Sequence, residues 1–123
     1  MMLVDTSIWV DHLREGVPAL ASALEQAGVL MHPFVRGELA CGNLKNRREV
    51  LRLLGELPAA PLATDAEALA FIERRALMGR GLGYIDVHLL ASVALAGGAR
   101  LWTRDKRLAA VAADLKLAHA ERA

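Results

Sequence analysis

Short runs of apolar residues alternate along the chain with longer segments in which apolar positions recur every three to four residues. The short runs are typical of buried strands, and the longer segments are typical of amphipathic helices. We expect strands at 2–5, 29–32 and 99–103, with a weaker candidate at 60–63. We expect helices at 7–16, 18–28, 33–44, 46–57, 64–79, 85–98 and 105–115.

Local signals support several of these helix boundaries. Pro18 stands at the first turn of one helix and Gly28 at its end, while Thr64 and Glu67 have the spacing of a capping box. The segment 85–98 is apolar on nearly all sides and is therefore expected at the centre of the fold. Strands that alternate with helices indicate parallel pairing with right-handed crossovers. The prediction is a three-layer α/β fold with a central, mostly parallel sheet of four or five strands flanked by helices.

The composition describes a compact globular protein. Hydrophobic residues make up 54% and charged residues 24% of the 123 positions, so we expect a single domain over residues 1–123. The longest stretch of low polarity, near 89–101, is too short to span a membrane. The single cysteine, Cys41, excludes an internal disulfide and is expected in the core. With no signal peptide visible at the N-terminus, these features favour a cytoplasmic location.

The formal net charge of +1 does not by itself indicate a nucleic-acid-binding protein. Basic residues nevertheless gather in three clusters at 45–52, 74–80 and 100–107. Each cluster taken alone is best interpreted as the solvated face of a helix. Arginine outnumbers lysine by 12 to 3, which favours phosphate or carboxylate partners because guanidinium groups bind them through two hydrogen bonds.

Three aspartates are expected at the edge of the sheet where parallel strands end, which is the usual place for sites in such folds. Asp5 ends the first strand, Asp105 follows the last strand, and Asp86 opens the central helix after a glycine-rich loop. Each also has a structural interpretation, because an aspartate near a helix N-terminus caps backbone amides. For any one of them alone, capping is the stronger interpretation.

Glu38 is harder to explain by capping, because it lies in the middle of the helix expected at 33–44. It shares one helical face with Phe34 and Val35, so we expect a buried carboxylate. Such a group must be paired, hydrogen-bonded or bound to a cation. Arg36 points to the other side of the helix, and a salt bridge to an arginine elsewhere in the chain remains the alternative.

Four carboxylates in one place would repel each other, by about 4 kcal/mol for a pair 4 Å apart at an effective dielectric constant near 20. Divalent cations remove this repulsion, and Mg²⁺ or Mn²⁺ suits a site made only of oxygen atoms. The four histidines show no zinc-ligand spacing with Cys41. A cation held by carboxylates lowers the pKa of a water molecule and neutralises charge on a phosphodiester. The acids therefore point to phosphodiester hydrolysis.

Four sequence segments resemble the acidic motifs of the PIN domain, in order and at the usual spacings. They are "LVDTSIWVDHL", "RGELACG", "YIDVHLLASVALA" and "LWTRDKRL". The resemblance covers nearly the whole chain and is greatest to the single-domain VapC toxins of bacterial toxin–antitoxin pairs. The first, third and fourth segments are fairly specific together, whereas the glutamate motif alone is weak.

This resemblance implies a metal-dependent ribonuclease with Asp5, Glu38, Asp86 and Asp105 as catalytic and metal-binding acids, of which the fourth is the least constant in the family. It also suggests Thr6, Ser7 and Thr103 as hydroxyls that orient the carboxylates. Family members usually form homodimers and are inhibited by a cognate VapB-like antitoxin.

Our hypothesis is a toxin that cleaves structured RNA, in transfer RNA or ribosomal RNA loops, with one or two Mg²⁺ ions, or Mn²⁺ in their place. Arg104, Lys106 and Arg80 are the candidate contacts to the RNA backbone. Two alternatives remain open. One is a phosphoryl-transfer domain in which Asp5 is the nucleophile, and the other is a non-catalytic module whose acidic cleft binds an arginine-rich partner.

Overall fold

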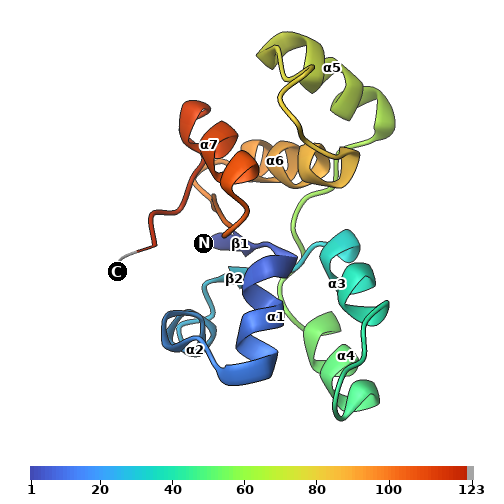
Figure 1. Ribbon diagram of the computed structural model, residues 1–123, viewed down its shortest axis with the longest axis vertical. Coiled ribbons are helices and arrows are strands. Elements are labelled where there is room, and N and C mark those ends of the chain that lie inside the picture. The colour runs from blue at the N-terminus through green and yellow to red at the C-terminus, as the bar shows by residue number, and fades with distance from the viewer. Residues whose placement is uncertain (122–123) are drawn as a thin grey trace.

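The computed structural model describes residues 1–121 (Figure 1). In this part of the chain the strands are β1 (Met2–Val4), β2 (Val29–Leu30) and β3 (Arg100–Trp102). The helices are α1 (Thr6–Glu15), α2 (Pro18–Glu25), α3 (Pro33–Ala40), α4 (Arg47–Gly55), α5 (Asp65–Arg75), α6 (Tyr84–Ala96) and α7 (Lys106–Asp114). None of these helices is long and apolar enough to cross a membrane.

The strands form a parallel sheet in the order β2-β1-β3, with β1 at the centre. Helices cover both sides, as Figure 1 shows: α6 and α7 lie on one side of the sheet, and α1 to α4 lie on the other. Helix α5 packs against α6. The expected three-layer α/β architecture with a parallel sheet is therefore confirmed.

The sheet is narrower than the four or five strands predicted. Beyond its two outer strands, pairing continues for one residue only, at the bridges Met31–Ala59 and Leu101–Ala118. The strand expected at 60–63 is wrong, because the pairing residue is Ala59. Pro58 and Pro61 flank this position, and proline has no N–H group to extend a ladder of hydrogen bonds.

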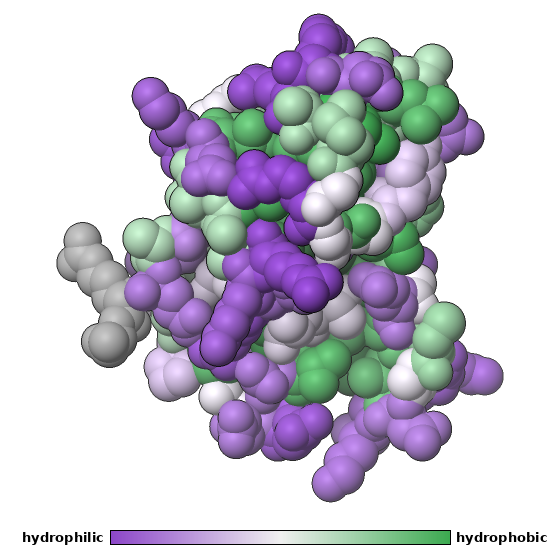
Figure 2. All heavy atoms as spheres, turned by 45° about the horizontal axis from the view of Figure 1, so that its top comes forward, coloured by the Kyte–Doolittle hydropathy of each residue, from purple (hydrophilic) through white to green (hydrophobic). Residues whose placement is uncertain are grey.

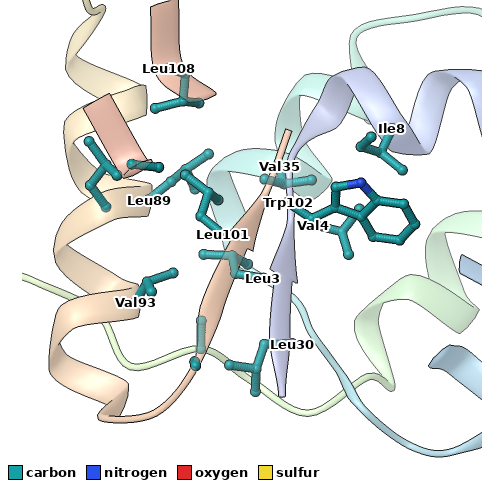
Figure 3. Packing of buried hydrophobic residues seen from close by; sticks show 14 of the residues in the cluster. Leu3, Val4, Ile8, Leu30, Val35, Leu89, Val93, Leu101, Trp102 and Leu108 are labelled. Carbon is teal, nitrogen blue, oxygen red and sulfur yellow. The ribbon is translucent and has the colours of Figure 1, made fainter. Parts of the chain in front are cut away.

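The core lies between the sheet and its helices. Figure 3 shows Leu89 and Val93 of α6 pointing toward Leu101 and Leu3 of the sheet. Every residue of α6 from 87 to 93 is buried, as its apolar pattern predicted. By contrast, Cys41 is exposed, so the expectation that it lies in the core is wrong. Helix α3 ends at Ala40 instead of reaching 44, which places Cys41 at its open end.

Helices α2 and α5 also end several residues earlier than predicted, in each case within two residues of one in a left-handed conformation. Helix α2 ends at Glu25 instead of 28, before Ala27 with φ +54°. Helix α5 ends at Arg75 instead of 79, and Ala76 has φ +53°. A residue in this region reverses the chain direction and cannot continue a right-handed helix. The apolar pattern does not reveal these stops, because alanine carries no turn signal.

Candidate active site

Asp5 lies at the carboxyl end of β1 and is 8% exposed. Its backbone amide donates to the carbonyl of Trp102, which ties it to the end of β3 (2.9 Å). Its Oδ2 atom accepts hydrogen bonds from the hydroxyls of Thr103 (2.7 Å) and Ser7 (3.0 Å). Although Asp5 occupies the N-cap position of α1, its side chain makes no capping hydrogen bond. Two hydroxyls from opposite ends of the chain therefore hold this buried carboxylate.

Asp105 reaches the same edge through the residue that holds Asp5. Its backbone amide donates to Thr103 Oγ1 (3.0 Å), and Thr103 Oγ1 in turn donates to Asp5. One carboxylate oxygen of Asp105 caps α7 by accepting from the amide of Leu108 (3.0 Å). The capping interpretation and the edge position both hold for this residue.

Asp86 also has a capping contact, since its Oδ2 atom accepts from the amide of Gly83 at the start of α6 (3.1 Å). Burial raises the pKa of Asp86 above its usual range, and the charges of Asp5, Asp105 and Glu38 raise it further, against the opposing effect of the Gly83 amide. Asp86 is thus the acid on which the charges of the other three candidates converge.

Glu38 joins this group through Thr6, whose hydroxyl donates to Glu38 Oε1 (2.7 Å). The expectation that its carboxylate is buried is wrong, because Glu38 is exposed. The face of α3 that it shares with Phe34 opens to solvent, and Phe34 itself is 40% exposed. Glu38 lines a pocket of about 580 Å³ between α1, α3 and the connection 42–46. Within residues 1–121 it forms no salt bridge, so that alternative finds no support there.

The donor atoms of the four acids suit a hard divalent cation, because all of them are carboxylate oxygens. The hydroxyls of Ser7 and Thr103 both donate to Oδ2 of Asp5. As the side chains stand, no three Asp, Glu, His or Cys residues of the described chain are close enough together to hold an ion. The donor atoms fit Mg²⁺ or Mn²⁺, although several of the acids could hold one ion only if their carboxylates turned toward one another.

Two of the three candidate RNA contacts are engaged with carboxylates of the chain itself. Arg104 binds Asp11 of α1 (2.6 Å) and Glu121 near the C-terminus (2.5 Å). Arg80 binds Asp114 of α7 (2.6 Å). Lys106, which begins α7, is exposed.

Sequence reasoning did not find these acidic partners. Arg104 and Asp11 are 93 positions apart and meet only when the sheet forms. Figure 2 shows hydrophilic and hydrophobic residues interspersed on one face of the molecule.

The sequence model of the PIN-domain family matches residues 2–114 of the chain. The chain belongs to the PIN-domain family. It is also similar to two proteins named Ribonuclease VapC32, from Mycobacterium tuberculosis strains CDC 1551 / Oshkosh and ATCC 25618 / H37Rv. Each is 51% identical over 121 residues, which cover 98% of this chain and 98% of the relative. The likeness to VapC-type PIN domains that the four sequence motifs suggested is thus confirmed.

Proposed function

We propose that this protein is a metal-dependent endoribonuclease and the toxin of a toxin–antitoxin pair. The 51% identity with ribonucleases over almost the full chain supports ribonuclease activity. The observation that carries the site assignment is the hydrogen-bonded network around Asp5, in which Thr103 and Ser7 converge on one carboxylate oxygen. Such a network holds a buried carboxylate in one direction, as a ligand for a cation requires.

In this proposal Asp5, Glu38, Asp86 and Asp105 hold Mg²⁺ or Mn²⁺. The bound cation supplies charge neutralisation at the phosphodiester and a water molecule of lowered pKa. Thr103 and Ser7 fix the direction of the Asp5 carboxylate, and Thr6 does the same for Glu38. The capping contacts of Asp86 and Asp105 fix these residues at the starts of α6 and α7, and so position their carboxylates.

The proposed substrate is structured RNA, in loops of transfer or ribosomal RNA, where an unpaired segment reaches an exposed carboxylate such as Glu38. Lys106 is the candidate backbone contact that stands next to the site. The proposed partners are a VapB-like antitoxin that inhibits the enzyme and a second copy of the chain in a homodimer. We also propose that residues 1–123 act as a single nuclease domain in the cytoplasm.

Asp5→Asn tests the site assignment. The variant keeps the shape of the side chain and removes its charge, so cleavage of a fluorescently labelled structured RNA should fall by about 100-fold or more. Glu25→Gln, on the exposed end of α2, is the matched control and should cleave at the wild-type rate.

Circular dichroism should show both variants folded, and calorimetric titration with Mn²⁺ should show binding to Glu25→Gln but weakened binding to Asp5→Asn. Full cleavage by a folded Asp5→Asn protein would rule out the proposed site. Uptake of phosphate from acetyl phosphate by the wild type would instead favour the phosphoryl-transfer alternative.

A further inference from the structure

Arg104 stands between Thr103 and Asp105, and its guanidinium group pairs with two carboxylates that are not among the four candidate acids. The guanidinium group binds Asp11 Oδ2 through one nitrogen (2.6 Å) and both carboxylate oxygens of Glu121 through the two others (2.5 and 3.2 Å). These carboxylates keep the pKa of Arg104 above its usual range. One side chain thus connects the turn after β3, helix α1 and the C-terminal segment.

The backbone of Arg104 belongs to the network around Asp5. Its amide donates to Ser7 Oγ (3.1 Å), and Ser7 Oγ donates to Asp5 Oδ2 (3.0 Å). Because Ser7 uses its proton on Asp5, the amide of Arg104 is the donor that orients the Ser7 hydroxyl. A shift of residue 104 would therefore reach Asp5 through a single intervening side chain.

The segment that carries Glu121 is itself fixed to β3. Leu101 donates its amide to the carbonyl of Leu117 (2.7 Å), and His119 donates to the carbonyl of Leu101 (2.8 Å). The rings of Trp102 and His119 lie in contact, with centroids 5.1 Å apart. Residues 117–121 therefore run beside the sheet edge and bring Glu121 to the turn that bears Arg104.

We propose that Arg104 is a positioning residue for the acid site, held by Asp11 and Glu121, and not a contact to the RNA backbone. The proposal rests on the proposed function, because it assigns Arg104 to the geometry of that site. By fixing the turn 103–105, the ion pairs set the hydroxyl of Thr103, the amide that binds Ser7 and the start of Asp105. A planar guanidinium suits this role, because it holds two carboxylates at fixed angles.

The energetics favour positioning over a role in global stability. Side chains exposed by about a third, as these are, form pairs that add little to the free energy of unfolding. Small displacements of catalytic groups, however, reduce rates strongly. The two carboxylates already take three of the five N–H donors of Arg104 and neutralise its charge, which weakens its attraction to a phosphate.

The test compares Arg104→Gln, Glu121→Gln and Asp11→Asn, with Glu25→Gln as the matched control. Positioning predicts that the first three variants lose about tenfold in kcat with KM unchanged, and that their Kd for Mn²⁺ rises about tenfold in calorimetry. Arg104→Lys should recover part of each loss, because a lysine restores one pair but not the fork. The double variant Arg104→Gln/Glu121→Gln should be no worse than Arg104→Gln.

A direct contact between Arg104 and RNA predicts different changes in KM and in RNA affinity. Arg104→Gln would then raise KM and reduce the salt dependence of RNA binding, while Glu121→Gln would release the arginine and tighten RNA binding. Either result overturns the proposal, as does an unchanged kcat in Glu121→Gln.

Amide hydrogen exchange without metal gives a readout that is independent of cleavage. Residues 104 and 105 should exchange faster in Glu121→Gln than in Glu25→Gln, and equal exchange overturns the proposal. If the wild type does not cleave RNA, the proposed function is wrong. Amide exchange and the Kd for Mn²⁺ still test whether Arg104 positions the acid site.

Discussion

At the scale of single residues, the site depends on hydroxyls as much as on acids. Asp5 is buried, and the desolvation of its charge is offset by two hydroxyl donors on one oxygen. The local sequence "DTS" contains one of these donors, whereas Thr103 comes from the other end of the chain.

Replacing Thr103 with valine tests this role, because valine keeps the shape and removes the hydroxyl. We expect RNA cleavage to fall by about 10- to 100-fold, since the Asp5 carboxylate loses its shortest hydrogen bond and Asp105 loses an acceptor for its amide. The free energy of unfolding, measured in urea, should fall by about 1 kcal/mol. Thr103→Ser is the control and should retain most of the cleavage rate; a fully active Thr103→Val would contradict the assignment.

His32 provides a prediction for pH. The side chain is 1% exposed and caps α3 by accepting from the amide of Phe34 through Nδ1. Burial, together with the nearby His88, lowers the pKa of His32 from 6.5 to about 4. Between pH 4 and pH 6.5, His32 is therefore protonated in the unfolded chain and neutral in the folded chain. The contribution to stability is complete above pH 6.5 and is lost as the pH falls toward 4.

Urea unfolding at pH 7.5 and 4.5 measures this effect against His32→Asn, which keeps a capping acceptor but does not titrate. The wild type should lose about 2 to 3 kcal/mol more than the variant between the two pH values. Carboxylates affect both proteins alike, so the difference reports His32. Equal losses would show that His32 is protonated in the folded protein.

At the scale of elements, helix ends decide where the acids stand. Helix α5 begins with the capping box that the sequence indicated, in which Thr64 and Glu67 bond each other's backbone amides. The sequence pattern did not indicate that α5 ends at Arg75, before the left-handed Ala76. The loop that leads to α6 and Asp86 starts at this point. A left-handed alanine is strained by its Cβ atom, and glycine avoids this strain.

Ala76→Gly should therefore raise the free energy of unfolding by about 0.5 to 1 kcal/mol. The control is Ala70→Gly, at an exposed position inside the same helix, which should lower it by about 1 kcal/mol. Both values come from chemical denaturation. Two changes of the same sign would mean that position 76 has an ordinary helical conformation.

At the scale of the whole molecule, the fold brings together charges that oppose folding. In the proposed site, the carboxylates from α3, α6 and the turns after β1 and β3 carry like charges, and their capping and hydroxyl contacts offset part of the repulsion. A ligand that binds only this assembled state stabilises the whole chain by mass action.

Mn²⁺ or Mg²⁺ should therefore raise Tm, and chelation of the ion should reverse the rise. At 100 times Kd the stabilisation should be about 2.7 kcal/mol, measured by thermal unfolding at constant ionic strength. Asp5→Asn should reduce the response, while Glu25→Gln should keep it. If NaCl of the same ionic strength raised Tm equally, charge screening and not a bound ion would explain the stabilisation.

Sequence patterns reached much of this fold for physical reasons. Burial imposes a period on strands and helices, so the apolar runs around Leu3 and Leu101 and the all-apolar segment of α6 were readable directly. The polarity of a parallel sheet brings strand ends to one edge, which accounts for the prediction that Asp5 and Asp105 lie near each other. The acids remain a proposed site, and the resemblance to PIN domains has been confirmed at the level of the family.

Contacts between distant segments decided the features of the fold and of the site that the sequence patterns did not predict. The exposure of Glu38 depends on how α3 packs, and the width of the sheet depends on the segments around residues 59 and 118, each of which pairs with the sheet for one residue only. The pairing of Arg104 with Asp11 and Glu121 leaves no periodic trace, because ion pairs need proximity and not spacing. The sequence by itself determined which acids are proposed for the site, because residue type and spacing are local properties, and only the tertiary structure decided what holds each of them in place.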